Sequence, residues 1–156
     1  MNSLNYGDIL MKNTKTVEQL KQVLADGYTL FIKLQNYHWH VKGPRFKSLH
    51  ELFEEQYQEL WPNLDEIAER IVTLGGKAPG TMKEFLDLTG IEEQSADKDG
   101  EAMIADLNKS HGVVVAGLKE LQRVAADEGD ASTEDLAIGR IFAHEKFQWM
   151  LRSHLE

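Results

Sequence analysis

Apolar residues recur at alternating intervals of three and four along the first helix that the sequence predicts. They are Val17, Leu20, Leu24, Phe31, Leu34 and Val41, with Gly27 and His38 in the two remaining places. This spacing places them on one face of an amphipathic helix of the kind that packs in a bundle. Thr16 and Gln19 match a capping box at its start, and Gly43-Pro44 ends it because proline cannot continue the hydrogen-bond ladder.

A second long helix is predicted by the same pattern. Ser48 and Glu51 match a capping box at its start, and Gly75-Gly76 ends it. Its apolar stripe consists of Phe53, Tyr57, Leu60, Leu64, Ile67, Ile71 and Leu74. Pro62 removes one backbone hydrogen bond inside this helix, so we expect a kink there.

Two further long helices follow a polar linker. The third carries the stripe Ile104, Leu107, Val114, Leu118, Leu121 and Ala125, and the fourth begins near Ser132. A short helix is predicted from Thr81, which matches a capping box with Glu84, in the crossover between the second and third long helices. No strand alternation is present, so the predicted fold class is all-α. We expect a four-helix bundle domain over residues 16–156, preceded by a flexible segment at residues 1–15.

The composition restricts the chemistry. The chain of 156 residues contains no cysteine, which excludes disulfides, thiolate zinc sites, iron-sulfur clusters and cysteine nucleophiles. Any metal must therefore use nitrogen or oxygen ligands. The net charge of -9 favours cations over nucleic acid and anionic lipid. Neither an export signal nor a membrane-spanning run is recognisable, so we expect a cytoplasmic protein with no membrane partner.

A second face of the second helix mixes potential metal ligands with apolar side chains. Successive helical residues rotate by about 100°, and four such ligands project within one sector of about that width. They are His50, Glu54, Asp65 and Glu69, and Trp61, Ala68 and Val72 lie among them. We expect this face to be buried against a partner.

The spacing of these ligands indicates that the partner is a second copy of the chain. Glu54 and Asp65 lie roughly 16 Å apart along the helix axis, so one metal ion cannot bind both within one chain. Two antiparallel copies about a two-fold axis would bring His50 and Glu54 of one chain beside Asp65 and Glu69 of the other. His38, a short turn away from His50, could complete each of the two equivalent sites.

Two imidazoles with three carboxylates suit Fe(II), Mn(II) or Zn(II), and carboxylate-rich ligation stabilises Fe(III) after oxidation. The set therefore predicts ferroxidase chemistry. Each residue by itself has a simpler interpretation: His38 as a hydrogen-bonded core residue, and Asp65 with Glu69 as part of a solvated helical face.

The other histidines carry no such pattern. His40 is rotated by about 200° from His38 and is assigned to solvent or a loop contact. His111, His144 and His154 lack acidic partners, and we expect them to be structural. The Glu-x-x-His pairs of intrachain di-iron bundles are missing, as are metalloprotease, hydrolase and nucleotide-binding signatures.

Three segments together resemble one known family. They read "YHWHVKGPRFKSLHELFEE", "LDEIAERIVTLGGKAPGT" and "HEKFQWMLRSHLE". The resemblance, which covers about Thr16 to Glu156, is to the Dps proteins, ferritin-like mini-ferritins named as DNA-binding proteins from starved cells. It implies a hollow dodecamer of two-fold dimers with ferroxidase centres at the dimer interfaces. Residue by residue, the implied iron ligands are His38, His50 and Glu54 from one subunit and Asp65 and Glu69 from its neighbour. Family members often carry aspartate at the position of Glu54.

This resemblance also implies an activity. Fe(II) is oxidised at the di-iron centre, commonly with hydrogen peroxide or else with O2, and ferric mineral is stored inside the shell, which protects against oxidative stress. The ligand set by itself also suits Zn or Mn in place of Fe. Trp39 matches a family tryptophan that takes up stray oxidising equivalents, and a packed interface aromatic is the alternative. Asp127, Asp130 and Asp135 resemble the family's acidic iron pores, and an ordinary helix-capping loop is the alternative.

DNA binding is expected to be weak or absent. Only Lys12 and Lys15 stand between the first residues and the first helix, and the acidic chain opposes contact with phosphates. Two functions of other classes stay open: a DNA-compacting structural protein with incidental metal binding, and a catalytically idle interaction shell that uses zinc structurally.

Overall fold

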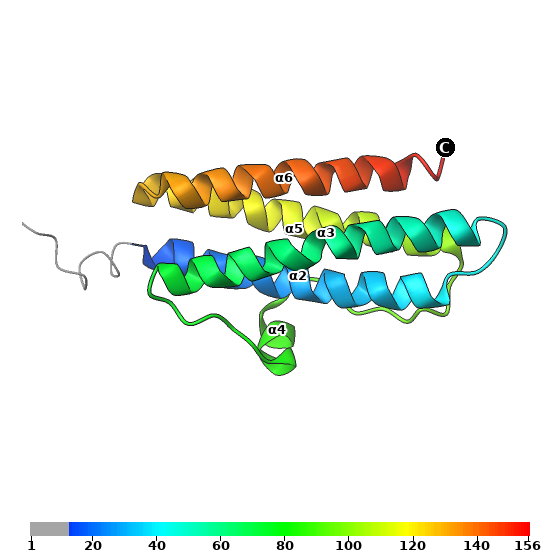
Figure 1. The fold of residues 1–156 in the computed structure, drawn as a ribbon, viewed down its shortest axis with the longest axis horizontal. Coiled ribbons are helices and arrows are strands. Elements are labelled where there is room, and N and C mark those ends of the chain that lie inside the picture. Colours follow the sequence, from blue (N-terminus) through cyan, green and yellow to red (C-terminus); the bar gives the residue numbers. More distant parts are fainter. Residues whose placement is uncertain (1–12) are drawn as a thin grey trace, which may run out of the picture.

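The computed structural model of the protein describes residues 13–156, and within them the fold is all-α, as predicted. The helices are α2 (Thr14–His40), α3 (Phe46–Thr73), α4 (Met82–Leu88), α5 (Gly100–Glu128) and α6 (Ala131–Arg152). The four long helices lie side by side as a bundle, and short α4 lies outside it, against α2, in the crossover between α3 and α5 (Figure 1). None of the described helices is long and apolar enough to cross a membrane.

The beginning of α2 differs from its prediction. The helix starts at Thr14, two residues before the expected domain boundary, and Thr16 does not cap it. Instead, the carboxylate of Glu128, at the end of α5, accepts hydrogen bonds from the backbone N–H groups of Lys15 (3.1 Å) and Thr16 (3.0 Å) and from the Thr16 hydroxyl (2.6 Å). A tertiary contact thus satisfies the free donors of this helix end. Most of the predicted flexible segment lies outside the described residues.

The cap prediction for α3 is also wrong, whereas that for α4 is confirmed. The turn after Gly43 already winds the backbone, so α3 begins at Phe46 and the Ser48 hydroxyl donates back to the Arg45 carbonyl at 3.1 Å. At α4, the Thr81 hydroxyl accepts from the backbone N–H of Glu84, whose carboxylate accepts from the Thr81 N–H. Local sequence patterns place a cap reliably only where no earlier turn competes. The helix α3 continues through Pro62.

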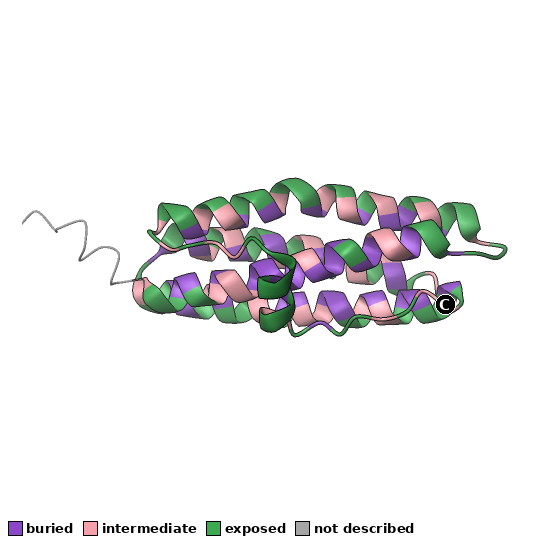
Figure 2. Ribbon diagram, turned by 90° about the horizontal axis from the view of Figure 1, so that it is seen from below, coloured by how far each residue is buried: buried purple, intermediate pink, exposed green. Residues whose placement is uncertain are grey.

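The core is formed by the faces on which the long helices meet, whereas α4 is largely exposed (Figure 2). Gly27 brings α2 and α3 close together, because a Cβ atom at this position would lie 2.3 Å from Cδ2 of Leu64. Leu64 is 1% exposed, and the adjoining cavity, about 10 Å³, has room for about one water molecule. The side chain of Leu64 therefore has little free space into which it can move.

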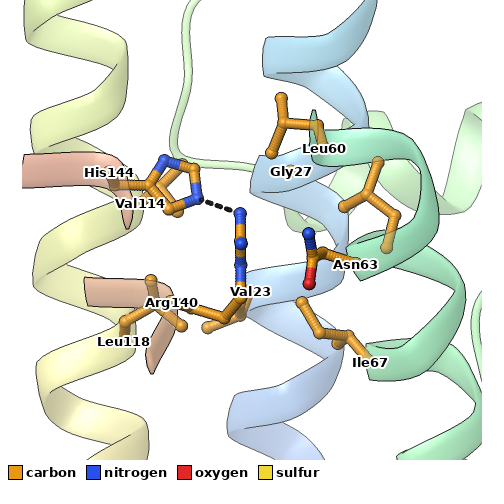
Figure 3. Close-up of a pocket in the computed structure, with 10 residues that line it drawn as sticks. Val23, Gly27, Leu60, Asn63, Ile67, Val114, Leu118, Arg140 and His144 are labelled. Atoms are coloured by element: carbon orange, nitrogen blue, oxygen red, sulfur yellow. Dashed lines mark hydrogen bonds between the residues drawn. The ribbon is translucent and has the colours of Figure 1, made fainter. Parts of the chain in front are cut away.

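A line of polar side chains crosses this apolar core and joins α3 to α5 and α6. Gln56 Oε1 lies 2.8 Å from His111 Nε2, and His111 Nδ1 lies 2.9 Å from His144 Nδ1. Arg140 donates to His144 Nε2 at 3.3 Å (Figure 3). It also binds both carboxylate oxygens of Glu59. Both histidines are buried. The expectation that they are structural agrees with this position.

The chemistry of Arg140 sets the direction of every hydrogen bond in this line. A guanidinium only donates, so His144 Nε2 must accept and its proton must sit on Nδ1. His111 then accepts at Nδ1 and donates from Nε2 to Gln56 Oε1. Both imidazoles are neutral in this arrangement. Burial and the nearby charge of Arg140 lower the pKa of His111 to about 3, and burial is also the main reason that the pKa of His144 lies well below its usual value.

Substitution of Gly27 by alanine is expected to destabilise the fold by about 1–3 kcal/mol, because the new methyl group overpacks the α2–α3 contact. Gly139→Ala is the matched control: nothing lies within 4 Å of its Cβ position, and it should stabilise α6 by about 0.5–1 kcal/mol. Denaturant unfolding measures both changes. Equal effects of the two substitutions would contradict close packing at Gly27.

The stability of the fold should decrease in mild acid through His111 and His144. Because their pKa values are lowered in the folded state, the unfolded chain binds more protons, and the free energy of unfolding falls as the pH drops below about 6.5. The expected slope is about 1.4 kcal/mol per pH unit for each histidine. Denaturant unfolding from about pH 6.5 to about pH 5 measures the slope. The slope should be shallower for His144→Gln than for the wild type, and it should be unchanged for His40→Gln, whose side chain is exposed. Equal slopes for the wild type and both variants would contradict the assignment.

Candidate metal centre

His38 and His50 form a close pair where the C-terminal end of α2 meets the first turns of α3. Their rings stack with centroids 3.7 Å apart and an interplanar angle of 13°. Nδ1 of His38 lies 2.7 Å from the backbone carbonyl of His50, and Nδ1 of His50 lies 2.7 Å from the backbone carbonyl of His38. The short turn at Gly43-Pro44 makes this reciprocal contact possible, and it brings together the two residues that the sequence analysis paired.

These two hydrogen bonds determine which nitrogen of each ring can bind a metal. A carbonyl oxygen only accepts, so Nδ1 of each histidine carries a proton and donates. In the neutral ring, Nε2 then keeps its lone pair, and neither Nε2 atom has a hydrogen-bond partner among residues 13–156. A backbone carbonyl on the outer nitrogen is the arrangement that orients metal-binding histidines in proteins. The pair is thus prepared to supply two nitrogen ligands.

Aromatic rings enclose the pair on both sides. Phe46 stacks on His50 with centroids 5.0 Å apart, and Tyr57 meets the His38 ring edge-on at 5.3 Å. Partial burial raises the pKa of Tyr57, and the negative charge of Glu54 raises it further. The carboxylate of Glu54 is half-buried and accepts a hydrogen bond from Gln58 at 3.2 Å. Neither ring was singled out from the sequence, because Tyr57 belongs to the predicted apolar stripe and Phe46 lies before the predicted start of the second helix at Ser48.

The acidic half of the predicted site lies at the other end of the same face of α3. Asp65 and Glu69 are exposed, and their carboxylates make no hydrogen bond or ion pair with any described residue. Trp61 and Val72, each 60% exposed, flank them. Two unpaired carboxylates beside two exposed apolar side chains are typical of a surface that another chain covers.

One subunit does not bring the two halves together. Within residues 13–156, no three histidine or acidic side chains are arranged to hold one metal ion. Of the predicted ligands, the structure brings only His38 and His50 into contact, whereas Glu54 follows His50 by one turn of α3 and Asp65 with Glu69 lie farther along that helix. Their union across a two-fold axis stays a prediction.

The sequence analysis also assigned roles to Trp39 and to three aspartates of a predicted iron pore, and their environments differ from one another. Trp39 is 63% exposed. Asp127 is exposed and pairs with Arg123 at 2.8 Å, and Asp135 is exposed. Asp130 is buried: it caps α6 by accepting from the Thr133 backbone N–H at 3.1 Å and it pairs with Arg70 at 2.8 Å. The capping alternative thus describes what Asp130 does in the subunit, and a pore formed by these residues stays a prediction.

The largest departure from the sequence analysis is the buried polar line through Gln56, His111, His144 and Arg140. A sequence signal existed, because Gln56 and Arg140 are polar residues on otherwise apolar helix faces. The pairing could not be foreseen, because only Arg140 and His144, four residues apart, are neighbours in the chain, whereas the two histidines lie 33 residues apart and the other partners 55 or more. The cavity beside His144 and Arg140 holds about one water molecule, so it is no substrate site.

Comparisons with known proteins agree with this architecture. The ferritin-like domain matches residues 17–156. A crystal structure of a Dps protein from Vibrio cholerae O1, described as a member of a broad superfamily of ferritin-like diiron-carboxylate proteins, superposes with a TM-score of 0.90 at 28% identity, over 94% of this chain and 92% of that one. The protein is therefore of the ferritin-like class.

More similar relatives narrow the class. The DNA protection during starvation protein 2 of Bacillus anthracis is 42% identical over 143 residues, which are 92% of this chain and 98% of that protein. A Dps protein from Bacillus brevis superposes with a TM-score of 0.89 at 31% identity over 100% of both chains. The chain belongs to the Dps family of ferritin-like proteins, as its three quoted segments predict.

Nitrogen NMR on histidine-labelled protein should distinguish two tautomers. At neutral or higher pH we expect the Nδ1–H form for His38 and His50, because each Nδ1 donates to a carbonyl, and the Nε2–H form for His111. The substitution His50→Gln identifies one resonance of the pair, and His111→Gln provides the reference for the other tautomer. An Nε2–H proton on His38 or His50 would contradict the assignment of Nε2 as the metal-binding nitrogen.

Proposed function

We propose that this protein is a Dps-type ferroxidase that oxidises Fe(II), with hydrogen peroxide as the main electron acceptor, and stores the ferric product in a hollow homo-oligomer. The observation that carries the proposal is the reciprocal hydrogen bonding of His38 and His50, which leaves one unpartnered Nε2 lone pair on each ring. Membership of a family with a ferritin-like diiron-carboxylate member supports iron as the substrate.

Each residue has a role in this proposal. His38 and His50 supply neutral nitrogen ligands, whose orientation the carbonyl hydrogen bonds maintain. Glu54 of the same subunit, with Asp65 and Glu69 of a second subunit, supplies carboxylates that neutralise the substrate cations and favour the ferric state. Two Fe(II) ions at one centre deliver two electrons together, so one peroxide molecule is reduced to water without release of hydroxyl radical.

The arrangement of α3 supports a dimeric site. The ligand sector also exposes Trp61 and Val72, and two antiparallel copies of this face would cover both side chains while joining each histidine half to an acidic half. Two such sites form in each dimer. A dodecameric shell built from these dimers is part of the proposal, and family membership supports it.

Nucleic acid is not part of the proposed mechanism. The net charge of this protein is -9, which opposes contact with phosphates. We propose that it acts through iron chemistry, with weak or no DNA binding at physiological salt. A gel shift at physiological salt that survives removal of Fe(II) would favour the alternative, a DNA-compacting structural protein.

Mixed dimers can test whether each site is shared between subunits. One variant loses the histidine half through His50→Ala, and a second loses the acidic half through Asp65→Ala with Glu69→Ala. Each alone should fail to accelerate formation of ferric absorbance when anaerobic Fe(II) meets hydrogen peroxide. Random reassembly of the two after unfolding should restore about one quarter of the wild-type rate, because half of the dimers are mixed and each mixed dimer has one intact site.

The matched control is Glu66→Ala, which removes an exposed carboxylate next to Asp65 but outside the ligand sector. It should oxidise Fe(II) at the wild-type rate. A mixture that stays inactive although its subunits exchange would overturn the shared site. If the wild type matches a protein-free control and binds Zn(II) tightly, the idle zinc shell becomes the better interpretation.

A further inference from the structure

Phe46, the first residue of α3, covers one face of the His50 ring. The centroids of these two rings are 5.0 Å apart, and the interplanar angle is 29°. His50 also stacks on His38 at 3.7 Å. Among the described residues, Phe46 and His38 make no ring contact with each other, so they lie on opposite faces of His50. The imidazole of His50 is therefore the middle ring of a stack of three.

The turn before α3 determines where the Phe46 ring lies. Gly43 has a φ of 103°, which side chains other than glycine rarely adopt, and its carbonyl accepts a hydrogen bond from the Phe46 backbone N–H at 3.0 Å. The helix thus begins at Phe46, and His50 follows one turn later on the same side. Helical side chains lean toward the N-terminus, so the His50 ring leans back onto Phe46.

The hydrogen bond of His50 is the more vulnerable of the two in the pair. Its acceptor, the carbonyl of His38, lies in the last turn of α2, where carbonyl groups lack a partner within the helix and water can bind them. The side chain of His50 is half-buried, whereas His38 is only 7% exposed. Water can therefore compete with Nδ1 of His50 for this carbonyl. If the ring turned away, Nε2 would lose its orientation as well.

We propose that Phe46 is a positioning residue of the metal centre: its ring holds His50 against His38 and so maintains the orientation of Nε2. This inference rests on the proposed ferroxidase function. Phe46 offers no ligand atom, and it acts on the substrate cation only through His50. The loss of one aromatic pair predicts a metal affinity that is weaker by roughly three- to tenfold.

Anaerobic titration of the metal-free, full-length protein with Co(II) measures this affinity without oxidation. Phe46→Leu removes the ring but keeps an apolar side chain, and it should weaken Co(II) binding by roughly three- to tenfold. Phe46→Tyr keeps the ring and should bind Co(II) as the wild type does. The matched control is Phe142→Leu, the same change at a phenylalanine of α6 that is 75% exposed, and it should have no effect.

Nitrogen NMR on the same metal-free proteins, labelled at histidine, observes His50 itself. At neutral or higher pH, the wild type and Phe46→Tyr should show the Nδ1–H form. In Phe46→Leu, the His50 signals should move toward the mixture of tautomers of an imidazole in water. A merely structural role of Phe46 would leave these signals unchanged.

Sedimentation of each variant tests the competing role of Phe46 in subunit contacts. Phe46→Leu should form the same oligomer as the wild type. If its subunits fail to assemble while His50 keeps the Nδ1–H form, Phe46 serves the subunit contact and the positioning role is overturned. Equal Co(II) affinities of Phe46→Leu and the wild type would also overturn it.

Fe(II) oxidation by these variants separates the positioning role from the ferroxidase function. A positioning effect should raise KM for Fe(II) in Phe46→Leu and leave kcat within about twofold of the wild type. If the wild type forms ferric product no faster than a protein-free control, the ferroxidase function fails, and the Co(II) and NMR results still decide whether Phe46 positions His50. If the wild type is active and Phe46→Leu matches it in KM and in its NMR signals, the positioning role alone is overturned.

Discussion

The rotation of α3 about its own axis is the constraint on which the proposed chemistry depends. Polar side chains on its inner side hold the helix: Gln56 binds His111, Glu59 binds Arg140, and Arg70 binds Asp130. Around the helix, these residues lie about 140–200° from Glu54, whereas the candidate ligands lie within about 60° of it. The face that carries the ligands must therefore point away from the core.

The polar line through the core also explains why two histidines can be buried next to a guanidinium. Each imidazole is neutral, and every hydrogen bond in the line runs from the guanidinium toward Gln56, so no donor faces another donor. The charge of Arg140 is balanced by Glu59, which is partly exposed. A buried charge without such a partner would cost several kcal/mol. The two pairs of histidines thus differ in their hydrogen bonding. Both ring nitrogens of His111 and His144 have partners inside the bundle, whereas His38 and His50 each keep one ring nitrogen without a partner among the described residues.

Much of the fold could be predicted because helical periodicity is a local property. The four long helices follow from spacing, and α4 follows from the capping box of Thr81 with Glu84, which is confirmed. The errors concern two helix ends. At α2, the carboxylate of Glu128 accepts hydrogen bonds from the helix end, which Thr16 was expected to cap. At α3, the Gly43 turn starts the helix before Ser48. The contact with Glu128 is not visible in a window of a few residues, whereas the Gly43 turn is local and competes with the cap predicted at Ser48.

By itself, the sequence determined that the chain forms a helical bundle, that any metal must be bound by nitrogen and oxygen, and that His50, Glu54, Asp65 and Glu69 share one sector of a helix. These conclusions need only the helical repeat and the residue types. The tertiary structure alone decided which ring nitrogens stay free, which aromatic rings contact the histidine pair, and which polar side chains hold α3 from behind. Each of those depends on atoms that lie far apart in the chain and meet only when α2, α3, α5 and α6 pack together.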